Sequence, residues 1–367
     1  MDKMFKRSLL GAAVAMCAAA GNANAAIELM GENVVLYGQA AGSLQYWSAD
    51  AKGADDNTVV EIESRIGLRG KVSYDNFAPH FIWQIETGNA WNREGNADGE
   101  GAFGGRDTYL GLEFDNFGQI KIGRQLVAAY DYVDWPHSNP GLGNVFDWHN
   151  AIGAGFQDRA NDVVRYDSAN WGGFDFQATL SGMTDTNDAL VASIAAGYTT
   201  DMFNIHAGYY HQGSYDVSKA KSCSISDKTE EIECTAATTE KAGDVSYAII
   251  GGTLWIDDFQ FTAAYKPMWN DRTDNKQNAY SVTAQYIMND KWVYKIGYAA
   301  TDDADKAVDR DGNGVLTTDT ASQAITGRLG YLLPSTYLFL DVRNYDMLGN
   351  SEKHDGTRVL LGAEYYF

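Results

Sequence analysis

The stretch from Glu61 to Val72 reads EIESRIGLRGKV and changes character at every second residue. Its apolar side chains share one parity: Ile62, Ile66, Leu68 and Val72. Its charged side chains share the other: Glu61, Glu63, Arg65, Arg69 and Lys71. Because successive side chains of a β-strand point to opposite faces, this stretch predicts a strand with one apolar and one charged face.

The same period of two recurs along the chain up to its last residue. Around Trp83, and again around Leu340 and Leu361, apolar residues alternate with polar ones. Counting such segments gives sixteen predicted strands, which we centre near Leu36, Arg65, Trp83, Tyr109, Ile120, Val164, Phe176, Ala192, Ala207, Ile249, Phe261, Val282, Tyr294, Ile325, Leu340 and Leu361.

The predicted connections alternate between short turns and long polar loops. The short turns are Asp75-Asn76, Asp115-Asn116, Thr200-Asp201, Asp257-Asp258, Asn289-Asp290 and Pro334-Ser335. The long loops lie near 49–57, 90–105, 125–157, 213–244, 301–320 and 347–355. Short turns on one side and long loops on the other are typical of outer-membrane barrels. We therefore predict an all-β fold, a 16-stranded antiparallel transmembrane β-barrel, formed as one domain by residues 26–367.

A soluble β-sandwich or jelly roll would also give a period of two. Aromatic residues favour the barrel, since they make up 13% of the chain and gather near the ends of predicted apolar faces: Trp83, Trp255, Trp292, Tyr298, Tyr331, Tyr337 and Tyr365. A lipid-facing barrel carries such girdles at both membrane interfaces. The opposite faces carry charges of both signs, which suits a water-filled lumen.

The first 25 residues have the pattern of a secretory signal peptide. Lys3, Lys6 and Arg7 precede the apolar stretch from Ser8 to Ala20, and Ala23-Asn24-Ala25 supplies small residues at the cleavage positions. We expect cleavage after Ala25, with a buried N-terminal helix as the alternative.

Composition argues against several other classes of protein. The net charge of −21 and the pI near 4.5 disfavour a nucleic-acid partner. The nucleophile-elbow, zinc-protease and phosphate-loop motifs are absent from the sequence. Asp134 and Asp147 could in principle hydrolyse a glycosidic bond, but nearby arginines would oppose the raised pKa that this needs. We therefore expect no catalytic residues and no enzyme activity.

Two features concern the loops. Cys223 and Cys234 bracket a polar stretch and predict a disulfide in an exported protein, with a reactive or metal-binding pair as the alternative. Asp309, Asp311 and Asn313 have the oxygen spacing that begins a calcium loop, although Thr320 stands where the closing Glu belongs. A Ca²⁺ ion there is one reading and a solvated acidic turn the other, and we expect no other cofactor.

Four motifs resemble those of the trimeric Gram-negative porins. They are Val34–Ala40 for the first strand, Ser64–Gly70 for the second, Phe117–Gln125 for the strand that enters the third loop, and the terminal Tyr366-Phe367. The resemblance implies a homotrimer in the outer membrane of a Gram-negative bacterium, in contact with lipopolysaccharide. It also implies that the third loop folds inward and narrows the pore.

The third loop carries two Asp-Trp pairs, Asp134-Trp135 and Asp147-Trp148. This pattern is similar to the chitoporins of marine Gram-negative bacteria, which are channels for chitooligosaccharides. Indole rings can stack on the C–H faces of a sugar while Asp134, Asp147 and Asn139 bond its polar rim. The alternative is that Trp135 and Trp148 are packed anchors of an inward loop.

The resemblance also implies a basic wall opposite the loop, made by Arg65, Arg106 and Arg159, with Arg124 joining them. By alternation Glu63, Arg328, Arg343 and Glu364 also face the lumen. All of these could instead be ordinary lumen charges. Arg106 shares its parity with Leu110 and Leu112, so we expect a bulge or a subunit interface near the fourth strand.

The predicted function is passive diffusion of saccharides, with chitooligosaccharides as the favoured class. A general diffusion porin for small hydrophilic solutes and ions is the alternative. A barrel with a plugged lumen, acting as an adhesin or a structural protein, is a third possibility.

Overall fold

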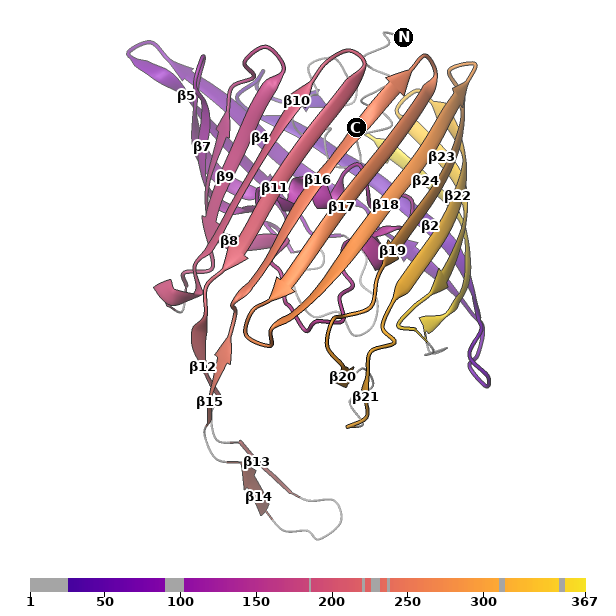
Figure 1. The fold of residues 1–367 in the computed structure, drawn as a ribbon. Helices are drawn as coiled ribbons and strands as arrows, with labels where there is room; N and C mark the ends of the chain where they lie inside the picture. The colour runs from indigo at the N-terminus through magenta and orange to yellow at the C-terminus, as the bar shows by residue number, and fades with distance from the viewer. Residues whose placement is uncertain are drawn as a thin grey trace.

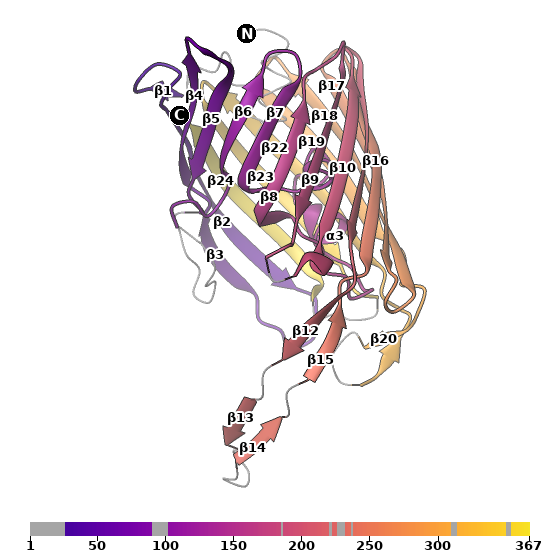
Figure 2. The same ribbon diagram turned by 90° about the vertical axis from the view of Figure 1, so that its left-hand side faces the viewer.

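The computed structural model describes residues 26–89, 102–184, 186–219, 222–225, 232–235, 238–309, 314–349 and 354–367. Within these residues the chain forms one closed antiparallel β-barrel, with the first described residues and the C-terminus at one end and long loops at the other (Figures 1 and 2). The predicted signal peptide lies outside the described residues. Among the helices described, none is long and apolar enough to cross a membrane.

Sixteen strands build the barrel wall, and the second of them is interrupted. It consists of β3 (Asn57–Ile62) and β4 (Arg65–Tyr74), which pair with successive parts of β2 (Val35–Ala49). The others are β5 (Phe77–Glu86), β6 (Thr108–Phe114), β7 (Gly118–Leu126), β8 (Arg159–Ser168), β9 (Phe174–Ser181), β10 (Val191–Thr199), β11 (Phe203–Gln212), β16 (Val245–Ile256), β17 (Phe259–Asn270), β18 (Asn275–Met288), β19 (Trp292–Thr301), β22 (Ser322–Leu333), β23 (Thr336–Asp346) and β24 (Gly356–Tyr366).

Pairing of the first and last spanning strands closes the sheet. The register of β2 with β24 runs from Gln39 opposite Tyr366 to Ala49 opposite Gly356. A two-residue strand, β1 (Ile27–Glu28), adds to the start of β2. All sixteen predicted strand centres fall within spanning strands, so the predicted fold class is confirmed.

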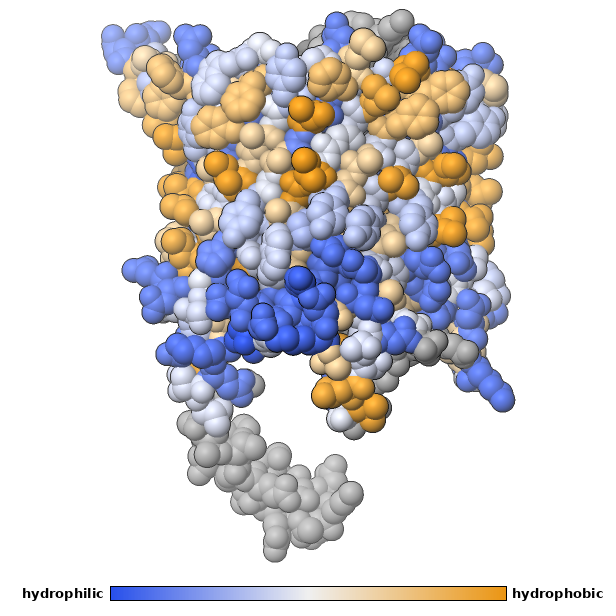
Figure 3. All heavy atoms as spheres, viewed as in Figure 1, coloured by the Kyte–Doolittle hydropathy of each residue, from blue (hydrophilic) through white to orange (hydrophobic). Residues whose placement is uncertain are grey.

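The side-chain distribution is inverted relative to a soluble protein. Ile250 and Ile296 on the outer face are 62% and 67% exposed, whereas Lys266 and Lys295 on the inner face are 2% and 5% exposed. Figure 3 shows hydrophobic and weakly polar residues over the barrel wall and strongly hydrophilic residues gathered at the loop end. A soluble sandwich would bury the first set and expose the second, so this alternative is excluded.

Most of the predicted aromatic girdle lies outside, but two assignments were wrong. Trp292 and Tyr331 meet edge to face on the outer surface, 4.7 Å between ring centroids. Trp255 instead shares the parity of buried Thr253, and its indole N–H donates to Gln260 at 3.3 Å. Tyr337 faces inward too, with the Arg328 guanidinium 5.6 Å from its ring centroid. Their place near a strand end suggested a girdle, but parity decides the face.

The connections follow the predicted alternation with three exceptions. The six predicted short turns and six long loops join the strands at opposite ends. The turn at 169–173, which has positive φ at Gly172 and Gly173, was missed. At the loop end, the sequence analysis also missed the connection at 182–190, with its short helix η1 (Asn187–Ala189), and the tight turn at 271–274.

Two long loops carry their own strands. The described residues between 213 and 244 form an arm that extends away from the barrel (Figure 1). In this arm β12 (Tyr215–Lys219) pairs with β15 (Thr238–Ala242), and β13 (Ser222–Ile225) pairs with β14 (Ile232–Thr235). The register places Cys223 opposite Cys234, so the backbone permits the disulfide, which stays a prediction. The loop after β19 carries β20 (Val308–Asp309) paired with β21 (Leu316–Thr317).

An outward-facing residue tests the orientation of the wall. We expect Ile296→Lys to reduce the stability of the folded barrel by about 2–4 kcal/mol, because it places a charge against hydrocarbon. The measurement is reversible unfolding in lipid vesicles. Ile296→Met, an apolar change at the same site, should differ little from the parent, and an equal loss in both variants would contradict this orientation.

Candidate functional site: the loop across the lumen

The segment between β7 and β8 lies against the inner face of the wall. It contains two short helices, α2 (Tyr130–Asp134) and α3 (Gly143–Phe146). Its apolar side chains, among them Val133, Leu142 and Phe146, are buried in one cluster with inward residues of the wall such as Tyr210, Tyr247 and Tyr345. This third loop therefore has a hydrophobic core of its own inside the barrel.

Hydrogen bonds fix the loop backbone to side chains of five different strands. Thr179 and Ser193 accept from the N–H groups of Ala128 and Ala129 at 3.0 and 2.9 Å. Three wall side chains donate to loop carbonyl groups: Lys266 to Asp147 at 2.9 Å, Ser281 to His137 at 2.7 Å and Tyr345 to Gly141 at 2.9 Å. Because these strands lie around much of the barrel, the loop is held along its length.

The five residues of α2 reach different partners. The Tyr130 hydroxyl donates to the Asp147 carboxylate at 2.9 Å, and the Arg165 guanidinium donates to Asp131 at 2.7 Å. Tyr132 stacks on His206, with ring centroids 4.2 Å apart and planes 8° apart. A helix this short gains little from its own backbone bonds, so these contacts hold it in place.

Asp134 faces the basic wall that the resemblance implied. Arg65, Arg106 and Arg159 all interact electrostatically with its carboxylate, and Arg106 also interacts with the other two arginines. Burial raises the pKa of Asp134, with Asp131 adding to the rise and the three arginines opposing it. The structure thus brings together one acid of the loop and three arginines of the wall, which are four of the predicted residues.

The arginines have acidic partners that the sequence analysis missed. Arg106 pairs with Glu86 at 2.5 Å and Arg159 with Asp107 at 2.6 Å, whereas Arg65 donates to the Gln39 amide oxygen at 3.0 Å. Glu86 shares the inward parity of Gln84, a signal that could have identified it. These pairs hold the guanidinium groups in fixed positions along the wall.

The fourth predicted arginine and the parity break at Arg106 also have a structural explanation. Arg124 donates to the Gly105 carbonyl oxygen at 2.9 Å and to the Asn161 side chain, beside Arg159. Arg106 precedes β6, which begins at Thr108, so it lies outside the strand and its parity carries no meaning. Neither a bulge nor a subunit interface is needed to explain that parity.

Asp134, Trp135 and Asn139 are half-buried. The two members of the second Asp-Trp pair differ, because Asp147 is buried and Trp148 is exposed. The Lys295 ammonium lies 5.6 Å from the Trp135 ring centroid. Asp147 is buried between Tyr130 and β17, and burial raises the pKa of its carboxyl. The structure therefore places Asp147 among the contacts that hold the loop. Trp148, by contrast, is 65% exposed.

Trp148 lines a pocket of about 400 Å³ at the loop end of the lumen. The other aromatic rings of this pocket belong to Trp47 on β2 and Tyr345 on β23, whose centroids lie 6.2 Å apart. Its polar lining consists of Gln45, Asn57, Asn144, His149, His354 and Arg358. Arg358 lies over Trp47, 5.3 Å from the ring centroid. We call this the aromatic pocket.

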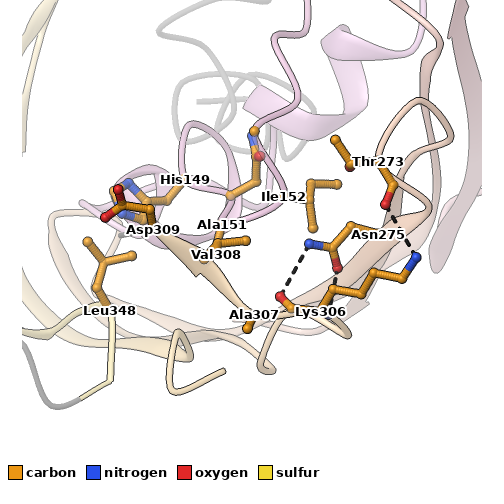
Figure 4. A pocket seen from close by; sticks show the side chains of 12 residues that line it. His149, Ala151, Ile152, Thr273, Asn275, Lys306, Ala307, Val308, Asp309 and Leu348 are labelled. Atoms are coloured by element: carbon orange, nitrogen blue, oxygen red, sulfur yellow. Dashed lines mark hydrogen bonds between the residues drawn. The ribbon is translucent and has the colours of Figure 1, made fainter. Parts of the chain in front are cut away.

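A second pocket of about 510 Å³, drawn in Figure 4, shares the lining residue His149 with the aromatic pocket. Asn275 donates to the Lys306 carbonyl oxygen at 3.4 Å and accepts from its N–H at 2.9 Å. Burial lowers the pKa of His149, and His354 adds to this effect. The lining is mainly aliphatic and polar, so the flat apolar surfaces lie in the aromatic pocket.

The remaining predicted lumen charges form two groups. Arg328 and Arg343 both donate to Asp341, at 2.6 Å each, and Asp341 is fully buried between them. Glu63 interacts electrostatically with Arg65, Arg343 and Glu364. Asp341 was missed, although it shares the parity of Arg343.

The calcium site in the loop after β19 stays a prediction. Asp311 and Asn313 lie outside the described residues, and Asp309 accepts from the Gly314 N–H at 2.8 Å. In the part of the chain that the structure describes, no three acidic, histidine or cysteine residues form a group suited to a metal ion.

Known structures share this architecture at low sequence identity, which shows the fold alone. The anion-selective porin from Comamonas acidovorans superposes with a TM-score of 0.66 at 20% identity, covering 91% of this chain and 99% of its own. OmpT of Vibrio cholerae, solved in a trimer form, gives 0.62 at 17% identity over 91% and 99%.

Sequence comparisons identify the family. A chitoporin of Vibrio furnissii is 33% identical over the full length of both chains, and outer membrane protein S2 of Salmonella typhi is 26% identical over 77% of this chain and 78% of its own. The pattern of the Gram-negative porin family matches residues 12–346. This chain therefore belongs to the Gram-negative porins, the channels for passive diffusion across the outer membrane.

Proposed function

We propose that this porin is a channel for saccharides and that chitooligosaccharides are its substrate class. The observation that carries the proposal is the aromatic pocket, in which Trp148 from the loop meets Trp47 and Tyr345 from the wall. The full-length similarity to a chitoporin supports the choice of sugar.

The chemistry of the aromatic pocket matches that of an acetamido sugar. A pyranose presents apolar C–H faces, and aromatic rings bury such faces well. Its hydroxyl and amide groups need donors and acceptors around the rim, which Gln45, Asn57 and Asn144 supply. Neutral amides can bind a neutral sugar without a large desolvation penalty, so a sugar can enter and still leave.

The constriction is the second step of the proposed path. A sugar that leaves the aromatic pocket would pass between Asp134 on the loop and the wall of Arg65, Arg106 and Arg159. These opposite charges create a transverse field that orients polar solutes. Trp135 and Asn139, both half-buried on the loop, would offer the next ring and amide along the path.

The assembly belongs to the proposal as well. A homotrimer is supported by the fold shared with porins such as OmpT, and the apolar outer wall supports contact with membrane lipid and lipopolysaccharide. The arm at 213–244 and the loops at the same end would then face the medium outside the cell.

The exposed ring of Trp148 gives the most direct test. We expect Trp148→Ala to weaken block of the channel current by chitohexaose by about 1–3 kcal/mol, the loss of one stacking ring. The measurement is current block in planar bilayers over a range of sugar concentrations, with maltohexaose as the comparison sugar, which should block poorly.

The control is Trp171→Ala, because Trp171 is 48% exposed on the outside at the short-turn end. This variant should keep the parent affinity. If both sugars block the parent channel only at millimolar concentration, the protein is better described as a general diffusion porin. If the reconstituted protein carries no steady current, its lumen is plugged.

Trp135 separates stacking from anchoring. We expect Trp135→Ala to weaken chitohexaose block by about 1–3 kcal/mol while ion conductance stays equal or rises, since a ring is removed from the path. Block and conductance are read in the same recordings. If chitohexaose blocks the Trp135→Ala channel as well as it blocks the parent, and the barrel of the variant is less stable to heat, then Trp135 only anchors the loop over Lys295 and does not bind sugar.

Asp134 tests the charge asymmetry. We expect Asp134→Asn to lower the cation-to-anion permeability ratio by about twofold or more, because the three arginines then lack their opposing charge. The reversal potential in a salt gradient measures this ratio. Asp274→Asn, an exposed loop carboxylate beside Lys306, is the control and should change little.

The raised pKa of Asp134 sets the direction of the pH dependence. A carboxyl with a raised pKa takes up its proton above the usual range near pH 4. The cation-to-anion permeability ratio of the parent should therefore fall with falling pH before ordinary surface carboxylates titrate. A ratio that is independent of pH between 7 and about 4 would contradict this.

A further inference from the structure

Two histidines meet inside the barrel where the third loop rests on the wall. The Nε2 atoms of His137 on the loop and His206 on β11 lie 2.9 Å apart. Both residues are buried, and His137 is fully inaccessible to solvent. A direct contact between two ring nitrogens requires one of them to carry a proton and the other to accept it.

The neighbouring groups determine which nitrogen donates. His206 Nδ1 lies 2.6 Å from the Asn204 side-chain oxygen, which can only accept, so the proton of neutral His206 sits on Nδ1. Nε2 of His206 is then an acceptor and Nε2 of His137 must donate. The Nδ1 atom of His137 is left buried without a hydrogen-bond partner among the described residues.

This arrangement accepts no additional proton. A proton on His206 Nε2 would bring two N–H groups face to face. A proton on His137 Nδ1 would create a buried cation that lacks an acceptor, which is costly. Burial accordingly lowers the pKa of His137 well below its usual range, and His206 and Lys295 add to the effect.

Residues of the loop and of two other strands pack against the pair. Tyr132 stacks on His206, Phe146 lies edge-on to His137 with centroids 6.0 Å apart, and Lys295 is the charged group that acts on His137. Gly251 on β16 makes room, because a methyl group there would lie 2.7 Å from His137 Nε2 and 2.8 Å from His206 Nε2.

We propose that His137 and His206 are positioning residues that hold the third loop in its constricting place at neutral pH and release it in acid. The sign follows from linkage. The released loop exposes histidines of ordinary proton affinity, so it binds more protons than the held loop, and acid favours release below about pH 6.5. Two residues before His137, Trp135 would lose its fixed position over Lys295.

The test needs no sugar, so its failure would leave the saccharide proposal standing. Transient closures of single channels are counted in planar bilayers at pH 7.5 and pH 5. We expect their rate to rise by at least about thirtyfold in the parent between these values. Each extra proton that the released loop binds lowers the stability of the held loop about tenfold per pH unit between pH 6.5 and pH 5. His137→Gln keeps a side-chain donor and removes one of the two titrating rings, so its rise should be at least about tenfold smaller than that of the parent.

Two matched controls separate the pair from general effects. His211→Gln removes a different histidine of β11 and should respond to pH like the parent. Gly251→Ala pushes the rings apart without changing a titratable group, so at pH 7.5 it should already show the closure rate that the parent has at pH 5. Gly327→Ala, with no atom within 4 Å of the added methyl group, should behave like the parent.

Each outcome decides the proposal. A parent rate equal at both pH values would overturn it, as would a His137→Gln response equal to that of the parent. If His137→Gln does not assemble, Gly251→Ala still tests the pair. A closure rate at pH 7.5 in Gly251→Ala that equals the parent's would show that the contact between His137 and His206 does not hold the loop.

Discussion

The requirement that every backbone N–H and C=O group facing hydrocarbon be paired within the protein shapes this molecule. The pairing of β2 with β24 meets it by removing the free edges of the sheet. Closure then leaves each strand with a lipid side, where Ile250 and Ile296 lie, and an inner side, which receives Lys266 and Lys295. The polar and charged residues of the site follow from that division.

A loop inside such a wall is subject to the same requirement. Its buried backbone groups are bonded to Thr179, Ser193, Lys266, Ser281 and Tyr345, so the wall has a side chain wherever the loop needs one. This explains why a five-residue helix can aim Asp134 at the arginines, Tyr132 at His206 and Asp131 at Arg165. The geometry of the constriction is set by the wall as much as by the loop.

The period of two identified every spanning strand, because each strand has one face toward the water-filled lumen and one face toward the hydrocarbon of the membrane. It also predicted the inward charges Arg65, Arg328 and Arg343. Position near a strand end was a poorer guide, as Trp255 and Tyr337 show. The aromatic pocket was beyond sequence reasoning, since Trp47, Trp148 and Tyr345 come together only through the closure of the sheet and the path of the loop. The same holds for His137 and His206, which are 69 positions apart.

The position of the third loop across the lumen can be measured directly. Gly297 on β19 faces Leu142 of the loop, whose Cδ1 would lie 2.7 Å from an added Cβ. In the double variant Leu142→Cys and Gly297→Cys, a short thiol-specific cross-linker should join the two residues in the membrane-embedded protein, and mass spectrometry should identify the linked peptides. We expect efficient linkage with ion conductance little changed, because the loop already lies there. Two accessible but unlinked cysteines, or linkage that abolishes the current, would contradict this account.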